Sequence, residues 1–251
     1  MSSSNRVAIQ EEFQLPSNGK FNGVPAVVQL RAMTLLDEKR RLAGQGLKSI
    51  IDCVDRCIVT EGVSAFNMCA QDVDFLMIKL RTITYGAEYK MSFVCSECGK
   101  TVNTSTNLDD LEITYAPEDF SSVFKIGPLP ISGDVLTVQE LDYNNIFAID
   151  TEAQRILAKF PNYEGDPTDV LNYVYKIKEV NGEQLPFPHL KQYVETMPAM
   201  DSIYFDEMYD KHSATFGISE QVVTTCTFCN ATQRRSLPYT GEFFRPRFDT
   251  V

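Results

Sequence analysis

This 251-residue sequence contains two Cys-x-x-Cys pairs with the spacing of metal ligands: Cys95 with Cys98, and Cys226 with Cys229. Structural zinc takes four tetrahedral ligands, and a Cys-x-x-Cys turn brings two thiolates to one ion at about 2.3 Å. Together the two pairs would complete one closed site. The sequence therefore predicts a structural metal site, with zinc as the expected ion and iron as the alternative that the same ligands allow.

The residues that follow each pair favour the same interpretation. A metal-binding turn bends the backbone after its second cysteine, where a positive φ suits glycine and, better than most residues, asparagine. Gly99 and Asn230 occupy these two places. A site of four thiolates and one divalent ion carries a formal charge of about −2, so we expect Lys100, Arg234 and Arg235 to help balance it.

Other chemistries fit these residues less well. A thioredoxin-like redox pair needs its first cysteine at the N-terminus of a helix, whereas each pair here lies between two strand patterns. A catalytic zinc needs an open position and a general base, and the deaminase signature is absent. His189 and His212 fit a turn and a helix end, with no nucleophile near either in the sequence. The sequence singles out no pair of carboxylates and carries no phosphate-binding loop or nucleophile elbow, so it predicts no enzyme.

The sequence predicts that two β-hairpins position the cysteines. Apolar residues alternate through residues 89–93 before the first pair, and a threonine-rich segment, 100–106, returns after it. Residues 221–225 and 232–237 flank the second pair in the same way. Because 127 residues separate Cys98 from Cys226, we expect a zinc ribbon whose halves are divided by an inserted unit.

Helical periodicity dominates the rest of the chain. Before the ribbon, a capping box at Thr34, an apolar stripe over 47–58 and a run from Asp72 to Gly86 predict three helices. Cys53, Cys57 and Cys69 fall on these segments as core residues. Between the cysteine pairs, a hairpin over 124–138 precedes helices at 143–160, 169–180, 190–197 and 202–215.

The expected fold class is α+β: a mainly helical body with a discontinuous four-cysteine zinc ribbon made of two β-hairpins. The expected divisions are an extended N-terminal arm (1–30), a helical region (31–86), the first ribbon hairpin (87–115), a β-hairpin plus acidic helical insert (116–220), and the second ribbon hairpin with a C-terminal tail (221–251). For the tail two interpretations stay open: Phe243 and Phe244 pack on the ribbon, or they wrap a neighbouring protein with Arg245, Arg247 and Phe248.

Charge narrows the classes of partner. The chain carries −11 in total, and residues 101–221 hold 21 acidic and seven basic side chains, which sum to −14. Such a segment repels a phosphate backbone, so no nucleic-acid partner is expected. The first residues lack the apolar stretch of a signal peptide, and no apolar run approaches the ~18 residues that span a bilayer. We expect no membrane partner and synthesis in a reducing cytoplasm.

In order along the chain, the motifs resemble the baseplate hub and hub-assembly proteins of contractile-tailed, T-even-like bacteriophages. The matching stretches are Asp74–Arg81 with Tyr85-Gly86, Cys95–Lys100, Leu129–Gly133, the run Val138–Tyr143 that leads into a helix, Cys226–Cys229, and Phe243–Pro246. They span most of residues 72–246. Asn230, where the first pair has glycine, departs mildly from the pattern.

The resemblance implies a non-enzymatic structural or assembly protein of the virion tail baseplate. Its implied partners are other tail and hub proteins, including tape-measure or tube proteins, within a symmetric multi-protein assembly. Virion component and assembly factor both remain open. The alternative from the residues themselves is a zinc-ribbon nucleic-acid-binding or transcription-type factor, favoured only by Arg234, Arg235, Arg245 and Arg247.

Overall fold

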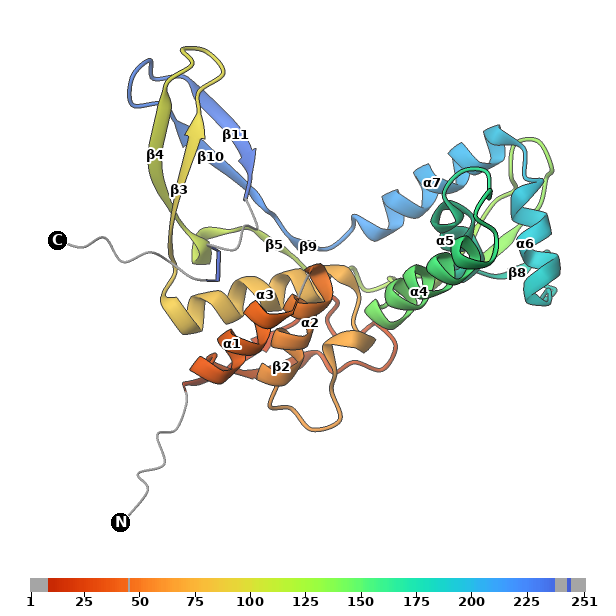
Figure 1. Ribbon diagram of the computed structural model, residues 1–251, viewed down its shortest axis with the longest axis horizontal. Helices are drawn as coiled ribbons and strands as arrows, with labels where there is room; N and C mark the ends of the chain where they lie inside the picture. The colour runs from red at the N-terminus through yellow and green to blue at the C-terminus, as the bar shows by residue number, and fades with distance from the viewer. Residues whose placement is uncertain (1–8, 45, 238–242, 245–251) are drawn as a thin grey trace.

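The computed structural model describes residues 9–44, 46–237 and 243–244, which form three parts (Figure 1). The body comprises residues 9–86. The ribbon comprises the hairpins β3–β4 and β10–β11 and projects from the body. The insert comprises residues 123–213 and lies on the other side of the body from the ribbon tips. The body and the insert each combine helices with small antiparallel strands, and the ribbon is made of strands alone, so the α+β class is confirmed.

The body begins with a hairpin where the sequence predicted an arm. Strands β1 (Gln10–Gln14) and β2 (Val27–Arg31) pair antiparallel. Leu15, Phe21, Val28 and Leu30 are fully buried in the main core. The predicted extended arm over residues 1–30 is therefore wrong from residue 10 onward, and residues 1–8 lie outside the described residues. The apolar residues are few and separated by turn residues, so only their packing on the helices reveals the core.

Three helices complete the body: α1 (Leu35–Ala43), α2 (Gly46–Cys57) and α3 (Ala70–Tyr85), with a short 3₁₀ turn, η1 (Ala65–Asn67), before α3. The predicted capping box is confirmed, since the Thr34 side chain accepts from the N–H of Asp37 and the Asp37 carboxylate accepts from the N–H of Thr34. Helix α3 ends at Gly86 with φ +90°, as predicted. Cys53, Cys57 and Cys69 are at most 1% exposed, which confirms their core placement.

The tail returns to the body. Phe243 is fully buried, and its ring lies 5.3 Å from that of Tyr89 at the base of the ribbon. The Arg41 guanidinium of α1 lies 5.3 Å from the centre of the Phe244 ring. Of the two interpretations of the tail, these residues follow the one in which they pack on their own chain. Arg245, Arg247 and Phe248 lie outside the described residues.

The ribbon consists of two hairpins. Strands β3 (Glu88–Val94) and β4 (Thr101–Asn107) pair in the first, and β10 (Gln221–Thr225) and β11 (Thr232–Ser236) pair in the second. After β4, the turn η2 (Leu108–Asp110) leads to β5 (Ile113–Thr114), which pairs with β9 (Gly217–Ile218) just before the second hairpin. The two halves of the ribbon therefore meet at the base through β5 and β9.

The insert contains a three-stranded antiparallel sheet in the order β6 (Val123–Ile126), β7 (Leu136–Gln139) and β8 (Ile177–Val180). Two details of the prediction are wrong. Residues 177–180, predicted as the end of a helix, form β8, because the buried Ile177 side chain joins the sheet core beside Val138. In the predicted hairpin over 124–138, the first strand stops at Ile126, because Gly127 and two prolines follow it.

The insert has four helices: α4 (Tyr143–Lys159), α5 (Pro167–Lys176), α6 (Phe187–Glu195) and α7 (Ala199–Ser213). Helices α5, α6 and α7 contribute to the core of the sheet, and α4 packs on α5. Each corresponds to a predicted helix, with ends shifted by a few residues. Phe205 of α7 is fully buried at the centre of the insert core. Among the helices of the described residues, none combines the length and the apolarity needed to cross a bilayer.

Candidate metal centre

The first cysteine pair lies in a tight turn at the tip of β3–β4. The Cys95 N–H donates to the Lys100 carbonyl oxygen and the Gly99 N–H donates to the Cys95 carbonyl oxygen, both at 2.9 Å. Gly99 has φ +68°, in the left-handed region that glycine adopts at low cost. This turn directs Cys95 and Cys98 to the same side of the hairpin tip.

The second pair repeats the geometry of the first. The Cys226 N–H donates to the Ala231 carbonyl oxygen and the Asn230 N–H donates to the Cys226 carbonyl oxygen, again at 2.9 Å. Asn230 has φ +58°. The positive φ expected after each pair is therefore observed at both places, and the hairpins present two similar turns to each other.

The four sulfurs of these turns come together. The Sγ atoms of Cys95 and Cys229 are 3.7 Å apart, those of Cys98 and Cys226 are 3.6 Å apart, and all four lie within 4.8 Å of one another. Four sulfurs at about 2.3 Å from one tetrahedral ion would be about 3.8 Å apart. The donor set and its spacing thus fit a single tetrahedral ion.

Burial differs within the cluster. Cys95 and Cys226 are at most 1% exposed and form a small core with Phe93 and Val102. Cys98 is partly buried and Cys229 is exposed. Each hairpin therefore supplies one inner and one outer sulfur, and an ion at the centre would be shielded on the side of the ribbon.

Hydrogen-bond donors surround the sulfurs. The Phe228 N–H donates to Cys226 Sγ at 3.4 Å, and the Gln233 side-chain amide donates to Cys95 Sγ at 3.5 Å. The backbone N–H groups of Lys100 and Ala231 point at the sulfurs of Cys98 and Cys229. Such donors stabilise thiolates. Sequence reasoning missed Gln233, because a single amide in a strand has no recognisable spacing relative to the cysteines.

The basic side chains near the site connect the hairpins. The Arg235 guanidinium donates to the carbonyl oxygen of Val94 at 2.7 Å and lies 4.3 Å from the centre of the Phe93 ring. The Lys100 ammonium lies 4.6 Å from the Phe228 ring centre. Both contacts cross from one hairpin to the other. Arg235 and Lys100 therefore join the two halves of the ribbon close to the sulfurs.

The protonation of the thiols depends on these surroundings. Burial opposes ionisation of Cys226, but N–H donation from Phe228 and Cys229 outweighs it and lowers its pKa to about 6. At Cys229 the N–H of Ala231 favours the thiolate, yet burial and the three neighbouring sulfurs raise its pKa to about 12. One thiol ionises readily and makes the next harder to ionise. A divalent cation would remove this repulsion.

The other candidate residues lie elsewhere. His212, at the end of α7, has its Nε2 2.9 Å from the Ser121 carbonyl oxygen and stacks on Phe124, in keeping with the predicted helix-end role. His189 lies in the first turn of α6.

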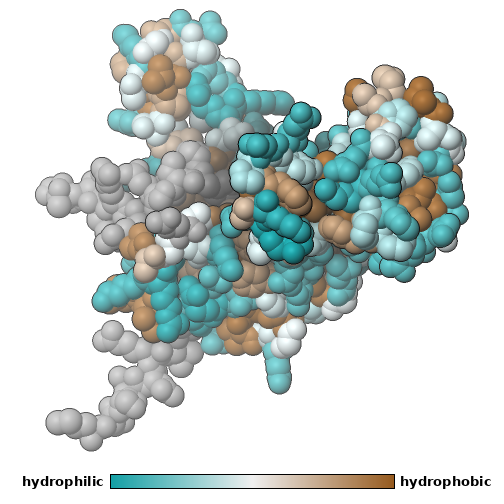
Figure 2. Space-filling model, turned by 45° about the vertical axis from the view of Figure 1, so that its right-hand side comes forward, coloured by the Kyte–Doolittle hydropathy of each residue, from teal (hydrophilic) through white to brown (hydrophobic). Residues whose placement is uncertain are grey.

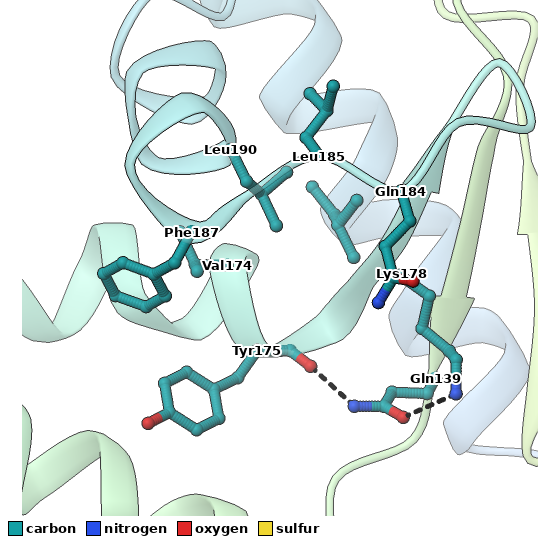
Figure 3. A pocket seen from close by; sticks show the side chains of 9 residues that line it. Gln139, Val174, Tyr175, Lys178, Gln184, Leu185, Phe187 and Leu190 are labelled. Carbon is teal, nitrogen blue, oxygen red and sulfur yellow. Dashed lines mark hydrogen bonds between the residues drawn. The ribbon is translucent and has the colours of Figure 1, made fainter.

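Open hollows occur in the insert, and Figure 3 shows one of about 340 Å³. Its walls combine apolar and polar side chains. The Gln139 amide donates to the Tyr175 carbonyl oxygen at 2.9 Å, and Lys178 donates to Gln139 at 3.5 Å. The polar side chains drawn on its rim are amides, a phenol and an ammonium, which do not form a nucleophile with its base.

A family model described as T4 bacteriophage base plate protein matches residues 8–245, which include both hairpins and the insert. The chain belongs to this family. No curated protein and no solved structure matches the chain. The protein is thus a structural phage baseplate protein, located in the virion tail and associated with other tail proteins. The resemblance drawn from the motifs is confirmed at the level of the baseplate.

Proposed function

We propose that this baseplate protein is a non-enzymatic structural or assembly protein of the tail hub. One zinc ion bound by Cys95, Cys98, Cys226 and Cys229 holds it together, and it acts through contacts with other hub, tape-measure or tube proteins. The main support for zinc binding is the spacing of the four sulfurs, with Sγ–Sγ distances of 3.6 and 3.7 Å across the two hairpins.

The zinc would act as a clamp. The sulfurs of Cys95 and Cys229 are 134 residues apart in sequence. An ion between them closes the long segment that contains the insert and fixes its two ends, in addition to the short β5–β9 pairing at the base. The chemistry that zinc supplies here is structural, since four thiolates leave no open position for water.

The surface supports a role in protein assembly. Large apolar side chains are exposed on two parts of the molecule: Ile131 (64%) and Met200 (57%) on the insert, and Phe228 (56%) at the ribbon tip. Figure 2 shows apolar residues at the surface of the insert among hydrophilic ones. Neighbouring exposed apolar groups with a polar rim are typical of protein-binding sites, whereas single exposed ones are common on any surface. A protein with several such sites is suited to joining neighbours in a symmetric assembly.

Metal analysis of the purified protein tests the clamp. We expect one zinc per chain and four thiols protected from alkylation until a chelator is added. The double variant Cys95→Ser/Cys226→Ser should lose the zinc, whereas Cys53→Ala, in the body core, should keep it. Zinc-free folded protein with four freely reactive ribbon thiols contradicts the clamp, and iron in its place would correct the metal.

Mass spectrometry and labelling of virions test the hub. A stoichiometric amount in mature virions, with an antibody label on the tail axis, supports a hub component. Presence only in assembling baseplates supports an assembly factor. A label at the periphery of the baseplate overturns the hub proposal and leaves membership of the baseplate family intact.

A further inference from the structure

Strand β6 is an edge of the insert sheet. In the order β6–β7–β8, no strand of the described residues pairs with β6 on its outer side. The Glu140 N–H donates to the Ser122 carbonyl oxygen, so the even-numbered residues of this strand exchange hydrogen bonds with β7. Antiparallel pairing alternates, which turns the backbone groups of Val123 and Lys125 outward. Lys125 therefore offers an outward N–H and C=O to a further strand.

A groove of about 370 Å³ follows this edge, between β6 and helix α7. Phe124, Tyr204 and Met208 provide its apolar walls. The His212 ring stacks on Phe124 at a centroid distance of 3.6 Å, which holds the inner wall in place. The groove thus combines a free strand edge with side-chain contact surface.

The charge of the groove is opposite to that of the insert. Residues 116–220 carry 18 acidic and seven basic side chains, a net −11. The lining of the groove contains Lys125, Lys211 and no carboxylate. Both lysines are exposed. A positive groove in an acidic part of the molecule favours an acidic ligand.

The groove continues into an apolar surface. Met200, Tyr204, Met208 and Lys211 recur at helical spacing along one face of α7. Met200, at the distal end, is 57% exposed. Ile131, 64% exposed, is held nearby because its N–H donates to the Asp201 carboxylate at 2.7 Å. The face is apolar at one end and cationic at the other.

The opposite edge of the sheet differs. Strand β8 ends in a tight turn in which Val180 and Glu183 exchange backbone hydrogen bonds. Beside it lies the hollow of Figure 3, whose lysine, Lys178, is engaged by Gln139. Of the two edges, the one at β6 has two exposed lysines in its groove and the longer apolar continuation, whereas the exposed Lys178 at β8 is hydrogen-bonded to Gln139.

We propose that β6 and the groove against α7 bind an extended segment of another baseplate protein. The segment adds as a strand to β6, places apolar side chains against Tyr204 and Met208, and places acidic side chains beside Lys211, on the α7 face of the sheet, and beside Lys125, on the opposite face. Backbone pairing supplies affinity and the side-chain contacts supply specificity. This inference rests on the proposed action through protein contacts, and it depends on neither the zinc nor the hub position.

Peptide binding to the full-length, zinc-loaded protein tests the groove. The probes are overlapping synthetic peptides that cover the tail and baseplate proteins encoded by the same phage, measured by fluorescence anisotropy. We expect the binding peptides to alternate apolar residues next to an acidic residue. The double variant Lys125→Glu/Lys211→Glu should weaken them by at least about tenfold, whereas the control Lys39→Glu/Lys159→Glu, on α1 and α4, should bind like the wild type.

Strand addition has its own readout. Bound peptide should slow hydrogen exchange at the Lys125 amide, and Lys125→Pro, which removes that outward N–H, should bind more weakly than Lys125→Ala. Circular dichroism checks that all variants are folded. The inference is overturned if no peptide binds, or if binding survives charge reversal without protection of this amide. A peripheral label in the virion experiment would remove the hub proposal and leave these peptide results unaffected.

Discussion

The ribbon and the insert are stabilised in different ways. At the ribbon tip, the buried cluster consists of Phe93, Val102 and two of the cysteines themselves. The insert has a larger apolar core, in which the Phe205 ring stacks on that of Tyr209 and contacts that of Tyr173 at a tilt. Two-stranded hairpins have marginal stability alone, whereas a sheet covered by helices can be stable without a metal. We therefore expect the stability of the ribbon, but not that of the insert, to depend on the metal.

Charge separates the same two regions. Residues 87–107 and 221–237 together carry four basic and two acidic side chains, a net +2, against −11 for residues 116–220. Most of the acidity therefore lies in the part that needs no metal. Because like charges repel, we expect the acidic faces of the insert to disfavour nucleic acid as a partner.

Loss of the metal should have the largest effect on stability, and it should destabilise the ribbon but not the insert. We expect Cys95→Ser/Cys226→Ser, or a chelator, to remove stabilisation on the order of 10 kcal/mol from the ribbon. Hydrogen exchange should then become fast in β3, β4, β10 and β11 and stay slow in the core of the insert. Equal loss of protection in both regions would show that the insert also depends on the metal.

Truncating a side chain in the insert core should destabilise the insert and leave the ribbon with its zinc unchanged. Phe205→Ala removes a fully buried ring and should cost about 3–5 kcal/mol. Denaturant unfolding followed by residue-resolved hydrogen exchange measures it, with zinc content unchanged at one per chain. Phe160→Ala, at an exposed position, is the matched control and should be nearly neutral. Zinc loss in the Phe205 variant would mean that the regions unfold together.

A half-buried carboxylate, that of Asp74 on α3, lies near the places where both regions join the body. Burial, with a smaller contribution from the charge of Glu220, raises the pKa of Asp74 from 3.8 to about 7. Below about pH 4 the group is protonated in both the folded and the unfolded chain. Between pH 4 and 7 the unfolded chain loses the proton first, so stability falls as pH rises, and the full cost is present above pH 7.

Asp74→Asn should therefore stabilise the protein on the order of 2–4 kcal/mol near pH 8, with a difference that vanishes near pH 4. Denaturant unfolding across this pH range measures it. Asp150→Asn, on an exposed face of α4, should show no such pH dependence. A gain that persists unchanged at pH 4 would assign the effect to packing instead of ionisation.

The smallest effect concerns the second cysteine turn. Asn230 has φ +58°, so Asn230→Ala should cost about 1 kcal/mol and lower zinc affinity about fivefold. Asn230→Gly should bind zinc at least as well as the wild type. Competition with a coloured chelator measures both. Equal affinity of the alanine and glycine variants would mean that the ion does not require this backbone conformation.

Local patterns predicted the elements that carry strong local signals. The capping box at Thr34, the stop at Gly86 and the strand at residues 221–225 depend on neighbouring residues, and the structure has them where they were expected. Residues 10–31 and 177–180 lack such signals. Their strands form because Leu30 and Ile177 are buried by residues distant in sequence.

The candidate site was predictable as a set of ligands but not as an arrangement. Spacing and residue type identify the two cysteine pairs, since a Cys-x-x-Cys turn is a local structure. Gln233, which donates to Cys95 Sγ, and Arg235, which binds the Val94 carbonyl oxygen, act across the two hairpins. Contacts of this kind depend on how the hairpins pack, and no spacing along the chain encodes them.

The α+β class, the two cysteine turns with their positive φ, and the location of the negative charge could all be predicted from the sequence. Each of them follows from short-range pattern or composition. Three other features are seen only in the folded structure. Residues 10–31 contribute to the core, Phe243 and Phe244 pack on their own chain, and the four sulfurs lie within 4.8 Å of one another. These features join residues far apart in sequence, and the burial of apolar surface that brings such residues together is non-directional and leaves no local pattern.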